Sequence, residues 1–118
     1  IARYGRSRNL HLASFGDFEF LRPCAPVDLL VCSDVLHYLP TRELDRGLPA
    51  LAELCGGMAF LEAFAREDEA VGDEHGFIAR PAAFYRKRLR ALGLRPLGSH
   101  CWLSPARVDA AASLELPD

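Results

Sequence analysis

Residues 27–39 read VDLLVCSDVLHYL, and this stretch decides the fold. Its first six residues are almost all apolar, and turn residues flank them, which is typical of a buried strand. An apolar run without alternation predicts a strand covered on both faces, as in a parallel sheet. Ser33 and Asp34 end the strand. Ligands of open α/β sheets bind beyond the carboxyl ends of the strands, so residues 33–38 form a candidate site.

An amphipathic helix is predicted after this strand, over residues 41–54, because leucines recur there at helical spacing. Pro49 lacks a backbone donor, so we expect it to kink or split this helix. Gly56 and Gly57 supply the helix stop. A second buried strand is predicted over residues 58–64, where apolar residues again predominate.

The flanking segments continue the alternation of strands and helices. A short strand is predicted over residues 10–15, and an acidic loop over 67–76. A further helix opens at Pro81, a favoured first position, and ends at Gly93. A third strand is predicted over residues 94–103, with a bend at Pro96, and a short helix follows from Ser104.

This order predicts an α/β protein in which right-handed βαβ units build a mostly parallel sheet with flanking helices. The chain has 118 residues and therefore fits one domain. Half of its residues are hydrophobic, which is enough for a packed core. Its net charge of −2 gives no reason to expect nucleic acid as a partner. No apolar run is long enough to span a membrane, so a membrane partner is not expected either.

The cysteines form no C-x-x-C pair, so neither a zinc ribbon nor a thioredoxin-type motif is predicted. Reduced, structural thiols in a cytoplasmic protein are the favoured interpretation. His100 and Cys101 are adjacent, but no third or fourth ligand accompanies them, and no metal site is predicted.

Each predicted strand is followed by a carboxylate or hydroxyl beside an apolar or aromatic group. These pairs occur at Asp17 with Phe18, at Asp34 with Val35, and at Glu62. Polar atoms can address the ring nitrogens and ribose of a nucleoside, while apolar groups cover its base. The sequence therefore favours a nucleoside-containing ligand at this edge of the sheet.

With these residues in view, the chain resembles the class I S-adenosylmethionine-dependent methyltransferases. Residues 27–39 look like the motif of their fourth strand, and Gly16-Asp17 looks like the end of their third. Residues 54–60 resemble the junction between a helix and the fifth strand. Residues 84–93 resemble the helix before the sixth. The resemblance covers roughly residues 10–103 and implies a Rossmann-like fold.

The resemblance also implies roles in binding the cofactor, S-adenosyl-L-methionine. It puts Asp17 at the adenine amino group and the backbone of Phe18 at the neighbouring ring nitrogen, and it makes Gly16 a further cofactor-binding residue. Three further residues would lie along the cofactor near its reactive end: Ser33, Asp34 and Val35.

On the acceptor side, the resemblance implies positions for His37, Tyr38, Glu62 and Tyr85. His37 is the candidate general base because imidazole titrates near neutral pH, but packing of this histidine is an equally open interpretation. For Tyr38 and Tyr85, packing at the edge of the core is the favoured alternative. The implied reaction is direct displacement, in which the protein mainly aligns donor and acceptor.

One departure from the family pattern is large. The glycine-rich loop and the acidic residue that ends the second strand are both absent. We therefore expect residues 1–118 to form one incomplete domain, the C-terminal part of a longer methyltransferase that acts on a small molecule. Alone, the chain should be inactive and bind the cofactor poorly. The N-terminal remainder, or a partner chain, would cover an exposed sheet edge.

Two other classes of protein share features of this sequence. A receiver domain also has an aspartate after a buried strand, but Pro40 comes too late after Asp34 for that pattern, and the only lysine, Lys87, lies in a predicted helix. A degenerate, non-catalytic methyltransferase-like module that binds protein partners stays open as the alternative function.

Overall fold

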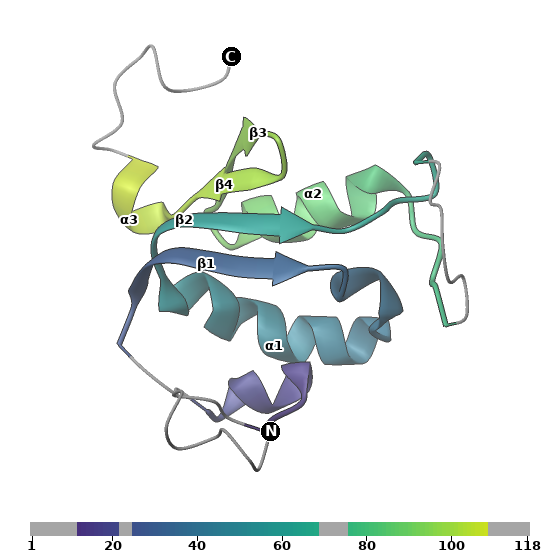
Figure 1. Cartoon of the computed structure of the whole chain (residues 1–118), viewed down its shortest axis with the longest axis horizontal. Coiled ribbons are helices and arrows are strands. Elements are labelled where there is room, and N and C mark those ends of the chain that lie inside the picture. Colours follow the sequence, from purple (N-terminus) through teal and green to yellow (C-terminus); the bar gives the residue numbers. More distant parts are fainter. Residues whose placement is uncertain (1–11, 22–24, 69–75, 109–118) are drawn as a thin grey trace.

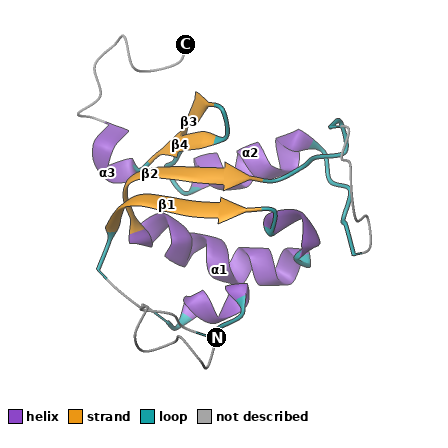
Figure 2. Ribbon diagram, viewed as in Figure 1, coloured by secondary structure: helices purple, strands orange, loops and turns teal. Residues whose placement is uncertain are grey.

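A computed structural model describes residues 12–21, 25–68 and 76–108. Within them the chain is a small α/β protein with a four-stranded mixed sheet and helices (Figures 1 and 2). The elements, in chain order, are the 3-10 helix η1 (Phe15–Glu19), β1 (Val27–Ser33), the 3-10 turn η2 (Leu36–Tyr38), α1 (Thr41–Leu54), β2 (Cys55–Glu62), α2 (Ala82–Ala91), β3 (Arg95–Gly98), β4 (Cys101–Leu103) and α3 (Pro105–Val108).

The sheet has the strand order β1-β2-β4-β3. β1 and β2 are parallel, whereas β4 runs antiparallel to both β2 and β3. The predicted α/β class is confirmed, and the sheet is mixed: β1, β2 and β3 run in one direction and β4 runs against them. The single strand predicted over 94–103 is a hairpin, because Ser99 and His100 adopt left-handed backbone angles (φ 53° and 65°) and reverse the chain after Gly98.

Only one face of β1 is covered by the residues that the structure describes. Leu30 packs against the buried core that also holds Ala59 and Trp102, its neighbours across the sheet. On the opposite face Leu29 and Val31 are 54% and 62% exposed. The prediction of a strand buried on both faces is wrong, because the core that α1 and α2 complete lies on one side of the sheet (Figure 1).

The helix predicted over 41–54 is confirmed at both ends by α1. Its leucines Leu44 and Leu48 are buried. Pro49 does not split it. Pro49 and Asp45, whose carbonyl loses its helical donor, both lie on the exposed side, where water can hydrate that carbonyl.

Gly56 and Gly57 do not stop α1 as predicted, because β2 begins at Cys55 and contains both glycines. The strand predicted over 58–64 thus starts and ends earlier than expected. A Cβ on Gly57 would overlap the carbonyl oxygen of Asp28 on β1. The glycine is required here by the close approach of two strands.

The strand predicted over 10–15 is wrong in its described part, since residues 12–14 are not in a strand and Phe15 opens η1. Leu10 and His11 lie outside the described residues. A capping box explains the difference: the Ser14 N–H donates to Asp17 Oδ2 over 2.9 Å. Such local bonds compete with strand pairing.

The two predicted C-terminal helices are confirmed where the structure describes them. α2 follows Pro81 directly, and Gly93 ends that segment with a φ of 87°. The short helix predicted after Ser104 is α3. Among the described residues, no helix combines the length and apolarity needed to cross a membrane.

Candidate functional site

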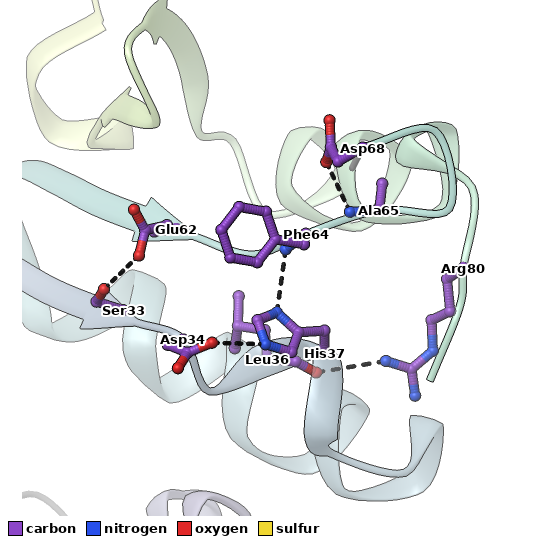
Figure 3. Close-up of polar contacts among 9 residues, drawn as sticks. All are labelled: Ser33, Asp34, Leu36, His37, Glu62, Phe64, Ala65, Asp68 and Arg80. Carbon is purple, nitrogen blue, oxygen red and sulfur yellow. Dashed lines mark hydrogen bonds and ion pairs between the residues drawn. The ribbon is translucent and has the colours of Figure 1, made fainter. Parts of the chain in front are cut away.

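The carboxyl ends of β1 and β2 bring three predicted site residues together. Ser33 and Glu62 are register partners, and the Ser33 hydroxyl donates to Glu62 Oε1 over 2.6 Å (Figure 3). The Asp34 N–H donates to the Glu62 carbonyl over 3.0 Å. Parallel strands end at one edge of a sheet, and the structure accordingly brings these three polar residues together there.

Left-handed backbone conformations gather at this same edge. Within the described ranges, positive φ at non-glycine positions occurs at Asp34 (59°), Ser99 and His100. The His100 carbonyl accepts from the N–H of Leu61, the residue before Glu62. At Ser99 and His100 this conformation belongs to the turn between β3 and β4, whereas at Asp34 it follows the end of a parallel strand.

His37 is buried directly behind the edge, with 1% of its surface exposed. Its Nδ1 accepts a hydrogen bond from the backbone N–H of Phe64 over 3.0 Å. Its Nε2 lies 2.8 Å from Asp34 Oδ1 (Figure 3). A ring nitrogen that accepts from an N–H carries no proton, so the neutral ring must carry its proton on Nε2 and donate it to Asp34.

This arrangement gives His37 and Asp34 different tasks. Both nitrogens of His37 are engaged, so the ring can take up a proton only if the bond from Phe64 breaks. The Asp34 side chain is 61% exposed and uses Oδ1 toward His37. Its second oxygen can therefore accept a hydrogen bond from a ligand, in an orientation that the buried ring fixes.

Aromatic rings enclose the His37 imidazole on several sides. Ring centroids of Tyr38, Phe77 and Phe64 lie 4.4, 5.1 and 5.5 Å from it. This packing keeps water away from the ring and strengthens its hydrogen bonds. Tyr38, predicted to face the acceptor, is half-buried against this ring.

Arg80 is buried beside the site, and no pattern in the sequence predicts it. It is 5% exposed, and one of its terminal nitrogens lies 3.4 Å from the Leu36 carbonyl. The same nitrogen lies 3.2 Å from the Tyr85 hydroxyl. An arginine before a proline in a predicted loop carries no sequence signal for burial, so spacing alone did not reveal it.

The Tyr85 hydroxyl is thus held by Arg80. Tyr85 lines a cavity of about 200 Å³ between β2, α2 and β4, together with Leu61, Leu89 and Trp102. The cavity is mainly apolar, with Asp68 among its polar lining groups. The prediction that Tyr85 contacts an acceptor stays a prediction.

The residues predicted at the adenine lie on η1, which packs against α1. The Gly16 N–H donates to Glu43 Oε1 over 3.1 Å, and the Asp17 carboxylate caps its own turn. Phe18 lines an apolar cavity of about 150 Å³ with Val31 and Cys32 of β1. Val35 is 38% exposed beside Asp34.

Burial makes two of the described thiols, Cys32 and Cys55, poor nucleophiles. Burial raises the pKa of the Cys32 thiol above its ordinary value. Burial likewise raises the pKa of Cys55, partly offset by a hydrogen bond from the Gly57 backbone. Within residues 12–21, 25–68 and 76–108, no three His, Cys, Asp or Glu side chains group as metal ligands would.

No family model, curated protein or solved structure matches the chain. Its function must therefore be argued from the edge of the sheet itself.

Proposed function

We propose that the chain is the C-terminal part of an S-adenosylmethionine-dependent methyltransferase that acts on a small-molecule acceptor. The observation that carries the proposal is the exposed Asp34 carboxylate, fixed by buried His37 where β1 ends. Asp34 stands next to Glu62 and Ser33, which add a second carboxylate and a hydroxyl. These groups are acceptors suited to ribose hydroxyls or an ammonium group.

The strand arrangement supports this class of protein. In class I methyltransferases the last strand runs antiparallel and inserts between the two strands before it. Among the residues that the structure describes, β4 is the last strand, runs antiparallel, and lies between β2 and β3. The order along the chain and the order across the sheet are thus those expected for the end of that fold.

The chain's own residues would bind and align. Asp34 and Ser33 would accept hydrogen bonds from the cofactor, and Val35 would cover an apolar part of it. Glu62 and Tyr38 would face the acceptor. The cofactor supplies a methyl group that its sulfonium already activates, so alignment carries most of the catalysis.

His37 enters this proposal as a positioning residue. The predicted general base would need a free nitrogen, and both nitrogens are engaged. Loss of the imidazole would free Asp34 to rotate, which would weaken ligand binding without removing a base.

The open side of β1 supports the proposal that these strands are part of a larger sheet. β1 is the outer strand of the sheet formed by the described residues, and Leu29 and Val31 are exposed on it. An edge of this kind calls for another strand. We propose that the N-terminal remainder of the domain covers it, and that the enzyme is cytoplasmic, as the free thiols suit.

A second candidate function rests on the same edge: a non-catalytic module that binds a protein partner through β1. It predicts no dependence on Asp34. The two functions are therefore separable by one carboxylate substitution.

Calorimetric titration tests the proposal. S-adenosylmethionine is titrated into this chain and into the chain extended by the sequence encoded upstream. We expect binding only to the extended chain, and loss of that binding in its Asp34→Asn variant. Asp45→Asn, an exposed carboxylate on α1, is the matched control and should bind normally. Binding to neither chain would favour the partner-binding module. Micromolar binding to the chain without the extension would refute the proposal that residues 1–118 lack part of the cofactor site.

A further inference from the structure

The guanidinium of Arg80 binds backbone carbonyls before and after His37 in its turn. It donates to the Leu36 carbonyl over 3.4 Å and, through its other terminal nitrogen, to the Leu39 carbonyl. These two residues flank His37 and Tyr38 in the chain, and Figure 3 shows the bond from Arg80 to Leu36.

The residues just before Arg80 hold the same turn. The Ile78 N–H donates to the carbonyl of His37 itself over 2.8 Å. The Phe77 ring lies against the His37 ring. Segment 77–80 therefore contacts His37 by its backbone and its ring, while Arg80 binds the carbonyls on either side.

Two helices in turn fix the position of the guanidinium. Its terminal nitrogens lie 3.3 Å from the Thr41 hydroxyl on α1 and 3.2 Å from the Tyr85 hydroxyl on α2. Its central carbon lies 4.9 Å from the centroid of the Phe84 ring. The partners of Arg80 among the described residues are thus carbonyls, hydroxyls and rings, which offset its desolvation and leave it little freedom.

We propose that Arg80 is a positioning residue of the site. It sets the turn Leu36–Leu39 so that His37 meets both the Phe64 N–H and the Asp34 carboxylate. Only a planar fork of donors reaches both flanking carbonyls at once; a lysine ammonium is a single point charge. The use of Asp34 by a ligand rests on the proposed function, but the geometry of His37 does not.

Nitrogen NMR of the chain labelled in its histidines tests this role. In the wild-type chain the His37 ring should give the signals of a fixed Nε2–H tautomer, with Nδ1 as acceptor. Arg80→Lys and Arg80→Met should shift these signals toward the average of two tautomers. Arg88→Met is the matched control: Arg88 also lies over the Phe84 ring, at 3.7 Å, but pairs with Asp45 on α1.

The indole signal of buried Trp102 reports in each variant whether the core is intact. If Arg80→Met unfolds, Arg80→Lys decides. A folded Arg80→Lys chain with unchanged His37 signals would overturn the proposal, because a purely structural role lowers stability without moving the tautomer. Unfolding of both variants would also overturn it, since Arg80 would then be a determinant of the whole fold.

This outcome is independent of the cofactor titration. Moved His37 signals together with absent cofactor binding would leave the positioning role standing and refute the proposed function. In the extended chain, Arg80→Lys should weaken S-adenosylmethionine binding about as much as His37→Ala does, while Arg88→Met should not.

Discussion

The backbone N–H of Phe64 donates to Nδ1 of His37, a residue 27 positions earlier in the chain. This one bond dictates where the imidazole proton resides, and therefore that His37 acts on Asp34 as a donor. The loop after β2 thus sets the orientation of a carboxylate at the end of β1.

The pH profile of the extended enzyme should separate a positioning His37 from a general base. His37→Ala should lower turnover by a similar factor at every pH, because the variant misplaces Asp34 without removing a titrating base. Loss of the profile's acidic limb in the variant would instead establish the base. Unchanged turnover at all pH values would exclude both roles.

His37→Ala should also destabilise the chain by roughly 2–4 kcal/mol, since it opens a cavity and leaves the Phe64 N–H unpaired. Urea unfolding followed by Trp102 fluorescence measures this change. His100→Asn is the matched control, because His100 is exposed and asparagine tolerates its left-handed backbone (φ 65°), and it should cost much less.

The left-handed backbone of Asp34 predicts an order of stabilities. Asparagine tolerates this conformation and can still accept from His37, so Asp34→Asn should stay close to wild type. Asp34→Ala should lose roughly 1–3 kcal/mol, because alanine is strained there and leaves the Nε2–H of buried His37 unpaired. Urea unfolding of the two variants checks the order, and equal stabilities would show that neither the strain of the turn nor the bond from His37 stabilises the fold.

Much of the fold could be predicted because its signals are local. The periodic leucines predict a helix over 41–54, which are the observed bounds of α1, and the apolar run of β1 predicts a strand. The β3–β4 hairpin was missed because Ser99 and His100, rather than glycines, take the left-handed positions. Solvent exposure of Leu29 was missed because an apolar run does not reveal which neighbours cover it.

The candidate site was predictable only in part. Asp34 and Glu62 follow strands, and that position is visible in the sequence. The bond from Phe64 to His37 and the reach of Arg80 to Leu36 join residues far apart, which spacing cannot reveal.

The two faces of β1 should respond differently to charge. Leu29→Lys should change stability by no more than about 0.5 kcal/mol, because this side chain is already 54% exposed. Leu30→Lys should cost roughly 1–3 kcal/mol, since Leu30 packs on the core. In the extended enzyme the proposed N-terminal remainder should also cover this face of β1 and make Leu29→Lys costly as well. A tolerant extended enzyme would contradict that coverage.

Alkaline pH should weaken the fold through Cys32. Burial raises the pKa of its thiol in the folded chain above the ordinary value of 9.0. The unfolded chain therefore releases this proton first as pH rises, and stability falls from about pH 9 upward. Urea midpoints at pH 8 and pH 10 should differ less in Cys32→Ala than in wild type. Equal differences would mean that the Cys32 thiol titrates alike in both states.

The adjacent glycines of β2 should differ in how they tolerate a methyl group. Gly57→Ala places a Cβ on the Asp28 carbonyl of the neighbouring strand, so β1 and β2 must separate or twist. We expect a loss of about 1–3 kcal/mol. Gly56→Ala is the matched control, because its nearest atom, the Val27 carbonyl oxygen, would lie 3.2 Å away and needs only a small shift. Urea unfolding measures the difference. If Gly57→Ala were as stable as Gly56→Ala, β1 would be held only loosely to β2. The carboxylate of Asp34, which follows β1, would then be less fixed than its bond with His37 requires.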